Sequence, residues 1–260
     1  MNTTVDLSQE KILSIQKAAE ILIQLHKSGK LGGEAMPEDS NPGLPVNAEE
    51  NYAYFTLPMA LNYQRNSYRL WESAKKTYLD TKTSDVFAPK NVINMEIDLL
   101  KEKLLKYGVA LQPNKHPQIW MQLCQTFTND FDGKIKELFK TNGNSVKNIK
   151  DYIANNKKKF PYLSGAKIVN YWLYVIGSYT DVAFVDNEYI TVAPDTHVLQ
   201  ASMKLGMINE KDIKNPKIRE LVSEMWDIIF RGTKRNPIDI HTPLWLWSRG
   251  GFSVEVKTDD

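Results

Sequence analysis

The alternation of β-branched and polar residues that strands require is almost absent from this chain. It occurs only in residues 188–192 (EYITV) and 252–256 (FSVEV), and both runs are short. Elsewhere apolar residues recur at helical spacing, as Ile12, Ile15 and Leu22 do near the N-terminus. The sequence therefore predicts a mainly α fold.

A segment rich in glycine and proline divides the predicted helices. Residues 28–47 (SGKLGGEAMPEDSNPGLPVN) show no periodicity and mark a long loop after a first helix that Asp6 or Ser8 caps. Helical spacing then predicts helices within residues 49–80, 92–107, 117–127, 130–139 and 145–155. We expect three segments: an N-terminal helix and linker that pack with the C-terminal lobe (1–48), a central helical lobe (49–185) and a C-terminal helical lobe (186–260).

Composition excludes several kinds of chemistry without selecting one. The 260 residues include 33 Lys or Arg and 31 Asp or Glu, so the net charge of +2 identifies no partner. Cys124 is the single cysteine, whereas an all-cysteine iron-sulfur cluster or zinc site needs four thiolates. The most apolar stretch, residues 168–177, is too short to cross a bilayer. We expect a cytoplasmic monomer that uses no membrane, no metal site and no iron-sulfur cluster.

Common catalytic motifs are also missing. Gln24 stands where a P-loop ending in Gly29-Lys30 needs glycine, and no GxGxxG opens a helix. The four histidines include no HExxH pair, and there is no GxSxG. Nucleotide-dependent, zinc-dependent and serine-hydrolase chemistry therefore lose most of their support.

A predicted helix-hairpin-helix is the most informative local feature. Residues 161–165 (PYLSG) join a helix expected to end near Lys159 to one expected to start near Ala166, so that the motif covers about 148–176. Gly165 is expected to supply the backbone conformation that lets the hairpin backbone come close to another group. Backbone N–H groups of the hairpin and of the second helix would point outward, where they can bind a phosphate group.

Lysines crowd this segment. Between residues 147 and 167 one acid, Asp151, accompanies six lysines: Lys147, Lys150, Lys157, Lys158, Lys159 and Lys167. Local charge thus indicates a nucleic-acid partner although net charge does not. We expect DNA contacts from the hairpin, its lysines and the proline-bounded loop LQPNKHP, which can enter a duplex gap or touch phosphate: Leu163, Ser164, Gly165, Lys157, Lys158, Lys159, Asn114 and Lys115.

Two segments together resemble a known family. LSGAKIVN (163–170) resembles the hairpin of the helix-hairpin-helix DNA glycosylase superfamily, and VAPDTHVLQASMKLG (192–206) is similar to its segment of valine, aspartate and histidine before a helix and a glycine turn. The archaeal 8-oxoguanine glycosylases are the branch we place nearest. The resemblance implies a two-lobed helical bundle with the active cleft between the lobes, Lys167 as nucleophile and Asp195 assisting departure of the base. Many relatives carry a four-cysteine iron-sulfur cluster, whose ligands this chain lacks; the hairpin backbone could hold a monovalent cation.

The residue types fit base excision. The reaction passes through an oxocarbenium-like sugar, which a carboxylate stabilises, and an amine can attack the anomeric carbon and form a Schiff base. Asp195 precedes the apolar spacing of a helix and is placed as its N-cap. A plain capping role for Asp195 and a phosphate contact for Lys167 remain open alternatives.

A flipped base also needs an aromatic surface and polar groups for its Watson-Crick edge. The segments that offer this mixture supply our expected base pocket: Tyr63, Gln64, Arg65, Trp71 and Trp247. Helical aromatics are more often core residues, so each assignment has a structural alternative.

Taken together, these features predict a nucleoid-associated DNA glycosylase that flips and excises a damaged or modified base, with abasic-site lyase activity through Lys167. One alternative is a monofunctional glycosylase for alkylated bases or for the hypermodified bases of viral DNA. Another is a non-catalytic helix-hairpin-helix module that binds DNA. The sequence leaves open which base is excised and whether the role is repair or antiviral defence.

Overall fold

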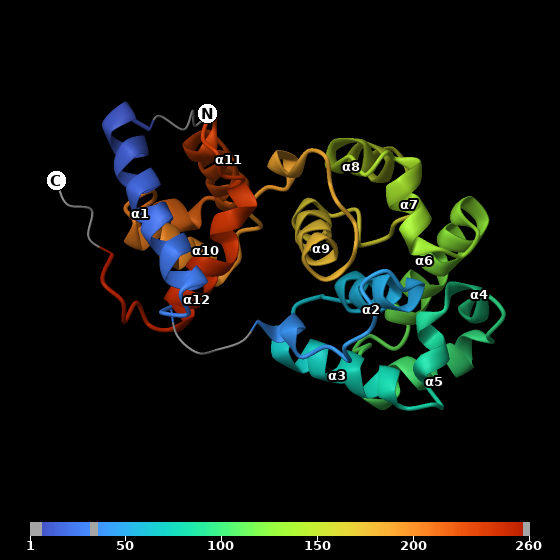
Figure 1. Cartoon of the computed structure of the whole chain (residues 1–260). Coiled ribbons are helices and arrows are strands. Elements are labelled where there is room, and N and C mark those ends of the chain that lie inside the picture. The colour runs from blue at the N-terminus through green and yellow to red at the C-terminus, as the bar shows by residue number, and fades with distance from the viewer. Residues whose placement is uncertain (1–6, 32–35, 257–260) are drawn as a thin grey trace. The chain divides into compact units, whose positions relative to one another are not determined.

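The computed structural model describes residues 7–31 and 36–256, which contain helices and no strand (Figure 1). The prediction of a mainly α fold is confirmed. The α-helices are α1 (Gln9–Lys27), α2 (Glu49–Ala60), α3 (Ser67–Leu79), α4 (Pro89–Val92), α5 (Ile97–Lys106), α6 (His116–Phe131), α7 (Ile135–Thr141), α8 (Val146–Asn155), α9 (Ala166–Tyr179), α10 (Thr196–Lys204), α11 (Ile218–Phe230) and α12 (His241–Arg249). Short 3-10 helices are η1 (Pro37–Asp39), η2 (Ser84–Phe87), η3 (Asn187–Tyr189), η4 (Asp212–Lys214) and η5 (Pro237–Ile240). The two strand-like runs form other structure: residues 187–189 make η3, and 252–256 are irregular.

Local capping chemistry sets several helix starts. The Ser8 side chain accepts a hydrogen bond from the Lys11 N–H at 3.3 Å and so caps α1. Ser145 caps α8 in the same way, accepting from the Asn148 N–H at 3.2 Å. The sequence left Asp6 and Ser8 open as the cap of the first helix, and the structure has Ser8 there; the cap at Ser145, where the predicted helix of residues 145–155 begins, is confirmed.

The chain divides into two compact units. The terminal unit contains described residues 7–31 and 187–256, and the central unit contains 36–186. Residues 36–48 thus belong to the central unit, whereas the sequence placed all of residues 1–48 with the C-terminal lobe.

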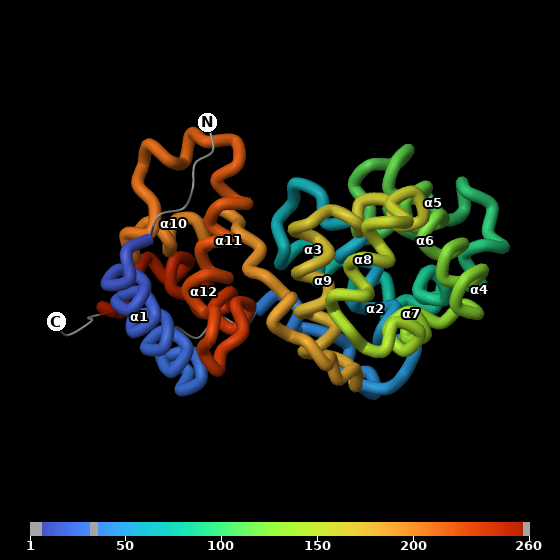
Figure 2. The backbone as a smooth tube through the Cα atoms, turned by 90° about the horizontal axis from the view of Figure 1, so that it is seen from above, coloured from blue at the N-terminus to red at the C-terminus, as the bar shows by residue number. Residues whose placement is uncertain are grey.

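Within the terminal unit, α1 packs against α11 and α12, and it lies beside α12 in both views (Figures 1 and 2). The Gln16 side chain donates to the Ile229 carbonyl at 2.5 Å. The Arg235 guanidinium holds the Glu20 carboxylate through two hydrogen bonds of 3.0 and 2.5 Å. These contacts fasten the first helix to the last third of the chain.

Helix α2 forms the core of the central unit. Residues 51–60 are buried without a break, and α2 packs against α3, α6, α7 and α9. The Thr56 hydroxyl donates to the Tyr52 carbonyl at 2.7 Å and accepts from the Trp172 indole at 3.0 Å. A helix that is apolar on every side is stable only when other helices surround it, and this fixes the layout of the unit.

The linker residues of η1 are attached to α9 by two tyrosines. Tyr171 donates its hydroxyl proton to Glu38 Oε1 at 2.6 Å, and Tyr179 donates to Asp39 Oδ1 at 2.5 Å. Glu38 is fully buried, and its Oε2 has no hydrogen-bond partner. Burial raises the pKa of the Glu38 carboxyl to about 7, because desolvation outweighs the hydrogen bond from Tyr171.

Glu38 therefore predicts a loss of stability as pH rises. The folded protein binds the Glu38 proton more tightly than the unfolded chain does, so this stabilisation is complete below about pH 4.5 and disappears as pH rises through 7. We expect the free energy of unfolding to be lower at pH 8 than at pH 5 by roughly 2.5 kcal/mol from this group. Urea denaturation at both pH values measures the difference. Glu38→Gln should remove the Glu38 contribution and leave that of Glu49, whose pKa burial also raises to about 7, whereas Glu102→Gln, at an exposed position of α5, should leave the whole difference in place.

Candidate functional site

Asp195 lies half-buried at the N-terminus of α10, in the terminal unit. Its Oδ1 accepts a hydrogen bond from the Val198 N–H at 3.0 Å, the N-cap contact that the sequence predicted. Its Oδ2 accepts from the Trp245 indole Nε1–H at 3.1 Å. In the described part of the chain no ion pair involves Asp195. Both carboxylate oxygens are therefore fixed by neutral donors.

The residues around this carboxylate form a hydrogen-bonded cluster between α10 and α12. The Ser248 hydroxyl donates to Gln200 Oε1 at 2.9 Å and lies 3.2 Å from His197 Nδ1. Because the hydroxyl has only one proton, Nδ1 of His197 is the donor to Ser248. The His197 ring meets the Trp245 ring edge-on, with centroids 5.4 Å apart.

The backbone that leads into Asp195 is held by α11. Arg219 donates to the Pro194 carbonyl at 2.5 Å, and the Ser223 hydroxyl donates to the Val192 carbonyl at 2.8 Å. The carboxylate is thus positioned by its own helix and by two others.

The connection between α8 and α9 differs from the predicted hairpin. Helix α8 ends at Asn155, so the connection covers residues 156–165 and is twice as long as PYLSG. Tyr162 adopts the left-handed backbone conformation, with φ +62°, whereas Gly165 has an ordinary φ of −65°. A side chain at position 165 would be crowded for another reason: a Cβ there would lie 3.2 Å from the Tyr162 carbonyl oxygen.

Most N–H groups of the hairpin are used within it. Leu163 donates to the Pro161 carbonyl at 2.7 Å, Ser164 to Phe160 at 3.0 Å and Gly165 to Tyr162 at 3.0 Å. The expectation that these amides point outward to phosphate is therefore wrong for residues 163–165. The first intrahelical bond of α9 runs from the Val169 N–H to the Gly165 carbonyl, so the donors left at this place belong to the first turn of α9.

The structure gives the hairpin residues different exposures. Lys167 is exposed as the second residue of α9, in the central unit, while Asp195 belongs to the terminal unit. Ser164 is half-buried and Gly165 exposed. Leu163 is fully buried and its N–H already donates to the Pro161 carbonyl, so neither its side chain nor its N–H is available for the predicted DNA contact.

The lysine cluster is less strongly charged than the sequence indicates. Lys147 pairs with Asp151 at 2.9 Å, and Lys159 pairs with Asp130 at 2.8 Å. Asp130 comes from α6, so counting along the 147–167 segment misses it. Lys157 and Lys158 are exposed and form no ion pair with any described residue.

A second surface brings two of the predicted DNA-binding segments together within the central unit. The Lys115 ammonium lies over the Tyr63 ring, 5.6 Å from its centroid. Tyr63 in turn meets Tyr162 of the hairpin edge-on at 5.7 Å, and the Tyr162 hydroxyl donates to the Asn62 carbonyl. Asn114 is exposed beside Lys115. We call the set of Tyr63, Asn114, Lys115 and Tyr162 the tyrosine-lysine surface.

Sequence reasoning missed one member of this surface. Tyr162 was read only as part of the hairpin, and its ring contact with Tyr63 joins positions 99 residues apart. Leu111, which begins the 111–117 loop, was also overlooked: it is apolar but exposes 54% of its surface.

Two side chains, the buried His116 and the half-buried Arg65, hold this loop and the residues just before it. His116 is buried, and its Nδ1 accepts the Leu111 N–H at 3.1 Å. Burial lowers the pKa of His116 to about 4, with the positive charges of Arg65 and Lys115 adding to the effect. The Arg65 guanidinium donates to the carbonyls of Val109 at 2.8 Å and Gly108 at 2.9 Å. Arg65 thus braces the backbone instead of facing a base, which corrects its assignment to the base pocket.

The expected base pocket does not form as a set. Trp71 is 1% exposed and packs against Tyr54 and Phe55, so it belongs to the core of the central unit. Trp247 is 4% exposed and donates its indole proton to the Val254 carbonyl at 2.8 Å in the terminal unit. Both assignments are wrong, because helical spacing placed these rings on core-facing positions. Tyr63 and Gln64 remain exposed.

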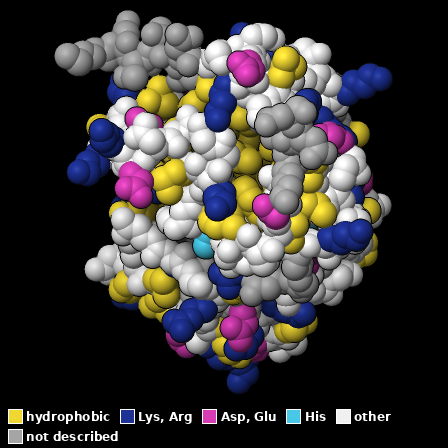
Figure 3. Space-filling model, turned by 90° about the vertical axis from the view of Figure 1, so that its left-hand side faces the viewer, with side chains coloured by type: hydrophobic (Ala, Val, Ile, Leu, Met, Phe, Trp, Pro, Cys, Tyr) yellow, Lys and Arg dark blue, Asp and Glu magenta, His cyan; other side chains and the backbone are white. Residues whose placement is uncertain are grey.

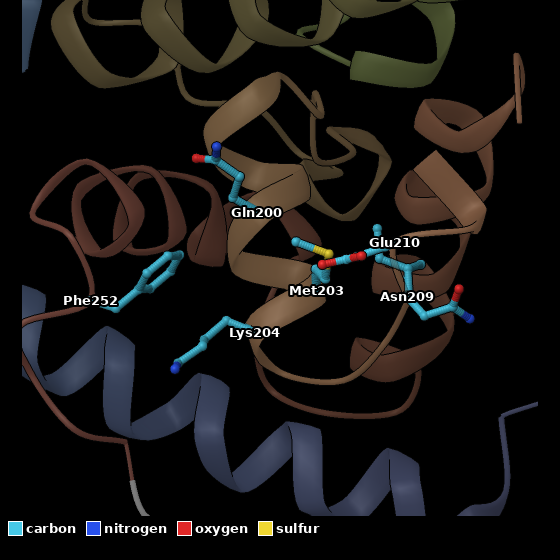
Figure 4. Close-up of a pocket in the computed structure, with 7 residues that line it drawn as sticks. Gln200, Met203, Lys204, Asn209, Glu210 and Phe252 are labelled. Carbon is cyan, nitrogen blue, oxygen red and sulfur yellow. The ribbon is translucent and has the colours of Figure 1, made fainter. Parts of the chain in front are cut away.

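A groove of about 640 Å³ runs along the C-terminal half of α10 (Figure 4). The Lys204 ammonium lies 5.9 Å from the centroid of the Phe252 ring on one side, and Asn209 and Glu210 lie on the other. Its lining contains neither Asp195 nor Lys167. On the face of the molecule nearest α1, basic and acidic side chains are interspersed and form no uniformly basic field (Figure 3).

Within residues 7–31 and 36–256, no three His, Cys, Asp or Glu side chains are grouped as metal ligands would be. No helix in those ranges has the length and hydropathy of a membrane span. Comparison with protein-family models and with curated proteins found no match for this chain.

Two of the three aromatic residues of the predicted pocket, Trp71 and Tyr63, should respond differently to truncation. Trp71→Ala should lower the free energy of unfolding by roughly 3–5 kcal/mol, since it leaves a cavity in the core. Tyr63→Ala should change it by less than about 1 kcal/mol, since the ring is on the surface. Chemical denaturation of both variants measures this, and a large loss for Tyr63→Ala would contradict its surface role.

Proposed function

We propose that this protein is a DNA glycosylase that flips a damaged or modified base out of the duplex and cleaves its glycosidic bond. The observation that supports the proposal most strongly is the arrangement of Asp195. Its carboxylate is half-exposed at a helix N-terminus, both of its oxygens are oriented, and no cation is paired with it among the described residues. A carboxylate in this state retains its charge for a cation that forms during the reaction.

The proposed chemistry needs few groups. Departure of the base leaves positive charge on the sugar, which Asp195 stabilises electrostatically. The neutral amine of Lys167 then attacks the anomeric carbon that the base has left, and its proton passes to the departed base. The bond between the anomeric carbon and the ring oxygen opens to give the imine, which permits β-elimination at the abasic site. The steps require neither a metal nor an iron-sulfur cluster. A monovalent cation on the hairpin backbone and association with nucleoid DNA belong to the same proposal.

The proposed DNA contacts lie on the central unit. Lys157 and Lys158 of the hairpin are available for phosphate, together with the first turn of α9. The tyrosine-lysine surface adds a cation and an exposed ring, the combination that contacts phosphate and unstacked bases. Its link to the hairpin through Tyr162 makes the two regions one continuous interface.

The central prediction concerns Asp195 and Lys167. Wild-type protein should release the base from at least one of a panel of duplexes that carry oxidised, deaminated, alkylated or glucosylated bases, beginning with 8-oxoguanine. Asp195→Asn keeps a good N-cap but removes the charge, so base release should fall by at least about 100-fold. Lys167→Ala should abolish the adduct that borohydride traps on the same duplex. Strand cleavage on denaturing gels and the trapped adduct are the measurements.

Each outcome decides a separate part of the proposal. If Asp195→Asn releases base as fast as wild type, the glycosylase assignment is wrong. Strand breaks that appear only after alkali, with no trapped adduct, would instead support a monofunctional glycosylase in which the exposed Lys167 contacts phosphate. Salt-dependent binding with no abasic product on any duplex would support the alternative of a non-catalytic DNA-binding module.

Phosphate contacts predict a salt dependence that separates free from paired lysines. Lys157→Ala and Lys158→Ala should each weaken duplex binding regardless of sequence, and each should reduce the slope of log K against log salt by about 1. Lys147→Ala is the matched control in the same segment, because Asp151 already neutralises its charge. Fluorescence anisotropy at several salt concentrations measures the slopes, and equal changes for all three variants would contradict this interface.

A further inference from the structure

The indole of Trp245 has one polar atom, and that atom is bonded to the proposed catalytic carboxylate. Trp245 lies on α12 with 8% of its surface exposed, and its Nε1–H reaches Asp195 Oδ2 at 3.1 Å. The two residues are 50 positions apart in sequence. No motif of the sequence connects them.

The two hydrogen bonds on Asp195 constrain it differently. The bond from the Val198 N–H is a local N-cap, which by itself leaves the carboxylate plane free to turn about that contact. The Trp245 bond comes from another helix and fixes the second oxygen. With both oxygens held, the carboxylate has one orientation.

The indole is itself held in place by its neighbours. The His197 ring packs against it edge-on at 5.4 Å, and the Arg249 guanidinium lies over it, 5.2 Å from the ring centroid. Trp245 is thus a rigid donor, whereas a surface side chain would lose rotamer entropy on forming the same bond.

We propose that Trp245 is a positioning residue that orients the Asp195 carboxylate toward the reacting sugar. The inference rests on the proposed glycosylase function. A neutral N–H donor suits this role because it orients the carboxylate without cancelling its charge, as a lysine or arginine partner would. Trp245 acts through Asp195 and does not itself touch the sugar.

Trp245→Phe removes the donor while retaining an aromatic ring. Its single-turnover rate of base release, on the duplex that wild type cleaves, should fall on the order of tenfold or more, as expected for a lost hydrogen bond to a charged group. The Kd for a duplex with a tetrahydrofuran abasic analogue should stay within about twofold, since Trp245 is not placed on DNA. Trp226→Phe is the matched control: it is buried in the same unit and also loses an indole bond, here to the Ser202 hydroxyl at 3.2 Å. The control should release base at the wild-type rate.

A double-mutant cycle separates positioning from a general packing defect. In the Asp195→Asn background, Trp245→Phe should cause no further loss of rate, because its effect passes through the carboxylate. A packing defect would instead reduce the rate by the same factor in both backgrounds, and that result would overturn the proposal. An indole ¹⁵N–¹H spectrum tests the hydrogen bond between Trp245 and Asp195 independently of catalytic activity. The Trp245 resonance should shift in Asp195→Asn, and the Trp226 resonance should not.

The two proposals fail in different ways. Undiminished base release by Asp195→Asn would refute the proposed function, and the role of Trp245 with it. Inactive Asp195→Asn together with fully active Trp245→Phe would refute the positioning role alone.

Discussion

Each unit is organised around one helix that has almost no water-exposed face. Residues 51–60 of α2 and residues 241–248 of α12 are buried without a break. Burying a polar atom without a hydrogen-bond partner costs free energy, so most polar side chains on such a helix have a partner inside the protein; the Tyr54 hydroxyl of α2 is an exception. In α2 the Thr56 hydroxyl bonds Trp172; in α12 the Ser248 hydroxyl bonds Gln200 and the Trp245 indole bonds Asp195. The geometry of the candidate site thus follows from the same requirement that builds the core.

The parts of the fold that depend on nearby residues could be predicted from the sequence. Helical spacing and caps act over three or four positions, so Ser145 and Asp195 were identified as N-caps from the sequence, and the cap of the first helix was narrowed to Asp6 or Ser8. The hairpin was only partly predictable. Its glycine was read as the residue with unusual backbone, but Tyr162 has the positive φ, and at Gly165 a side chain would be crowded by a close carbonyl.

The candidate site depends on contacts between distant segments, and a pattern search does not find these. Trp71 and Trp247 lie in segments that mix aromatic and polar residues, as a base pocket does. The structure nevertheless places both rings in the core. The charge of the hairpin was overestimated for a similar reason, since Asp130 neutralises Lys159 from another helix. Conversely, the contact of Tyr63 with Tyr162 joins two segments whose sequences give no sign of being neighbours. Resemblance located the carboxylate, but only the fold identified its second donor.

The tyrosine-lysine surface is supported by the buried His116 and the half-buried Arg65, whose protonation is constant near neutral pH. His116 must be unprotonated at Nδ1 to accept the Leu111 N–H, and its pKa of about 4 keeps it so across the physiological range. Arg65 remains charged, and its two bonds to backbone carbonyls fix the residues that precede this loop. The loop that carries Lys115 is therefore held in one shape before any partner binds. A preformed loop loses less conformational entropy on binding, so a short surface with one cation and two rings can contribute measurably to affinity.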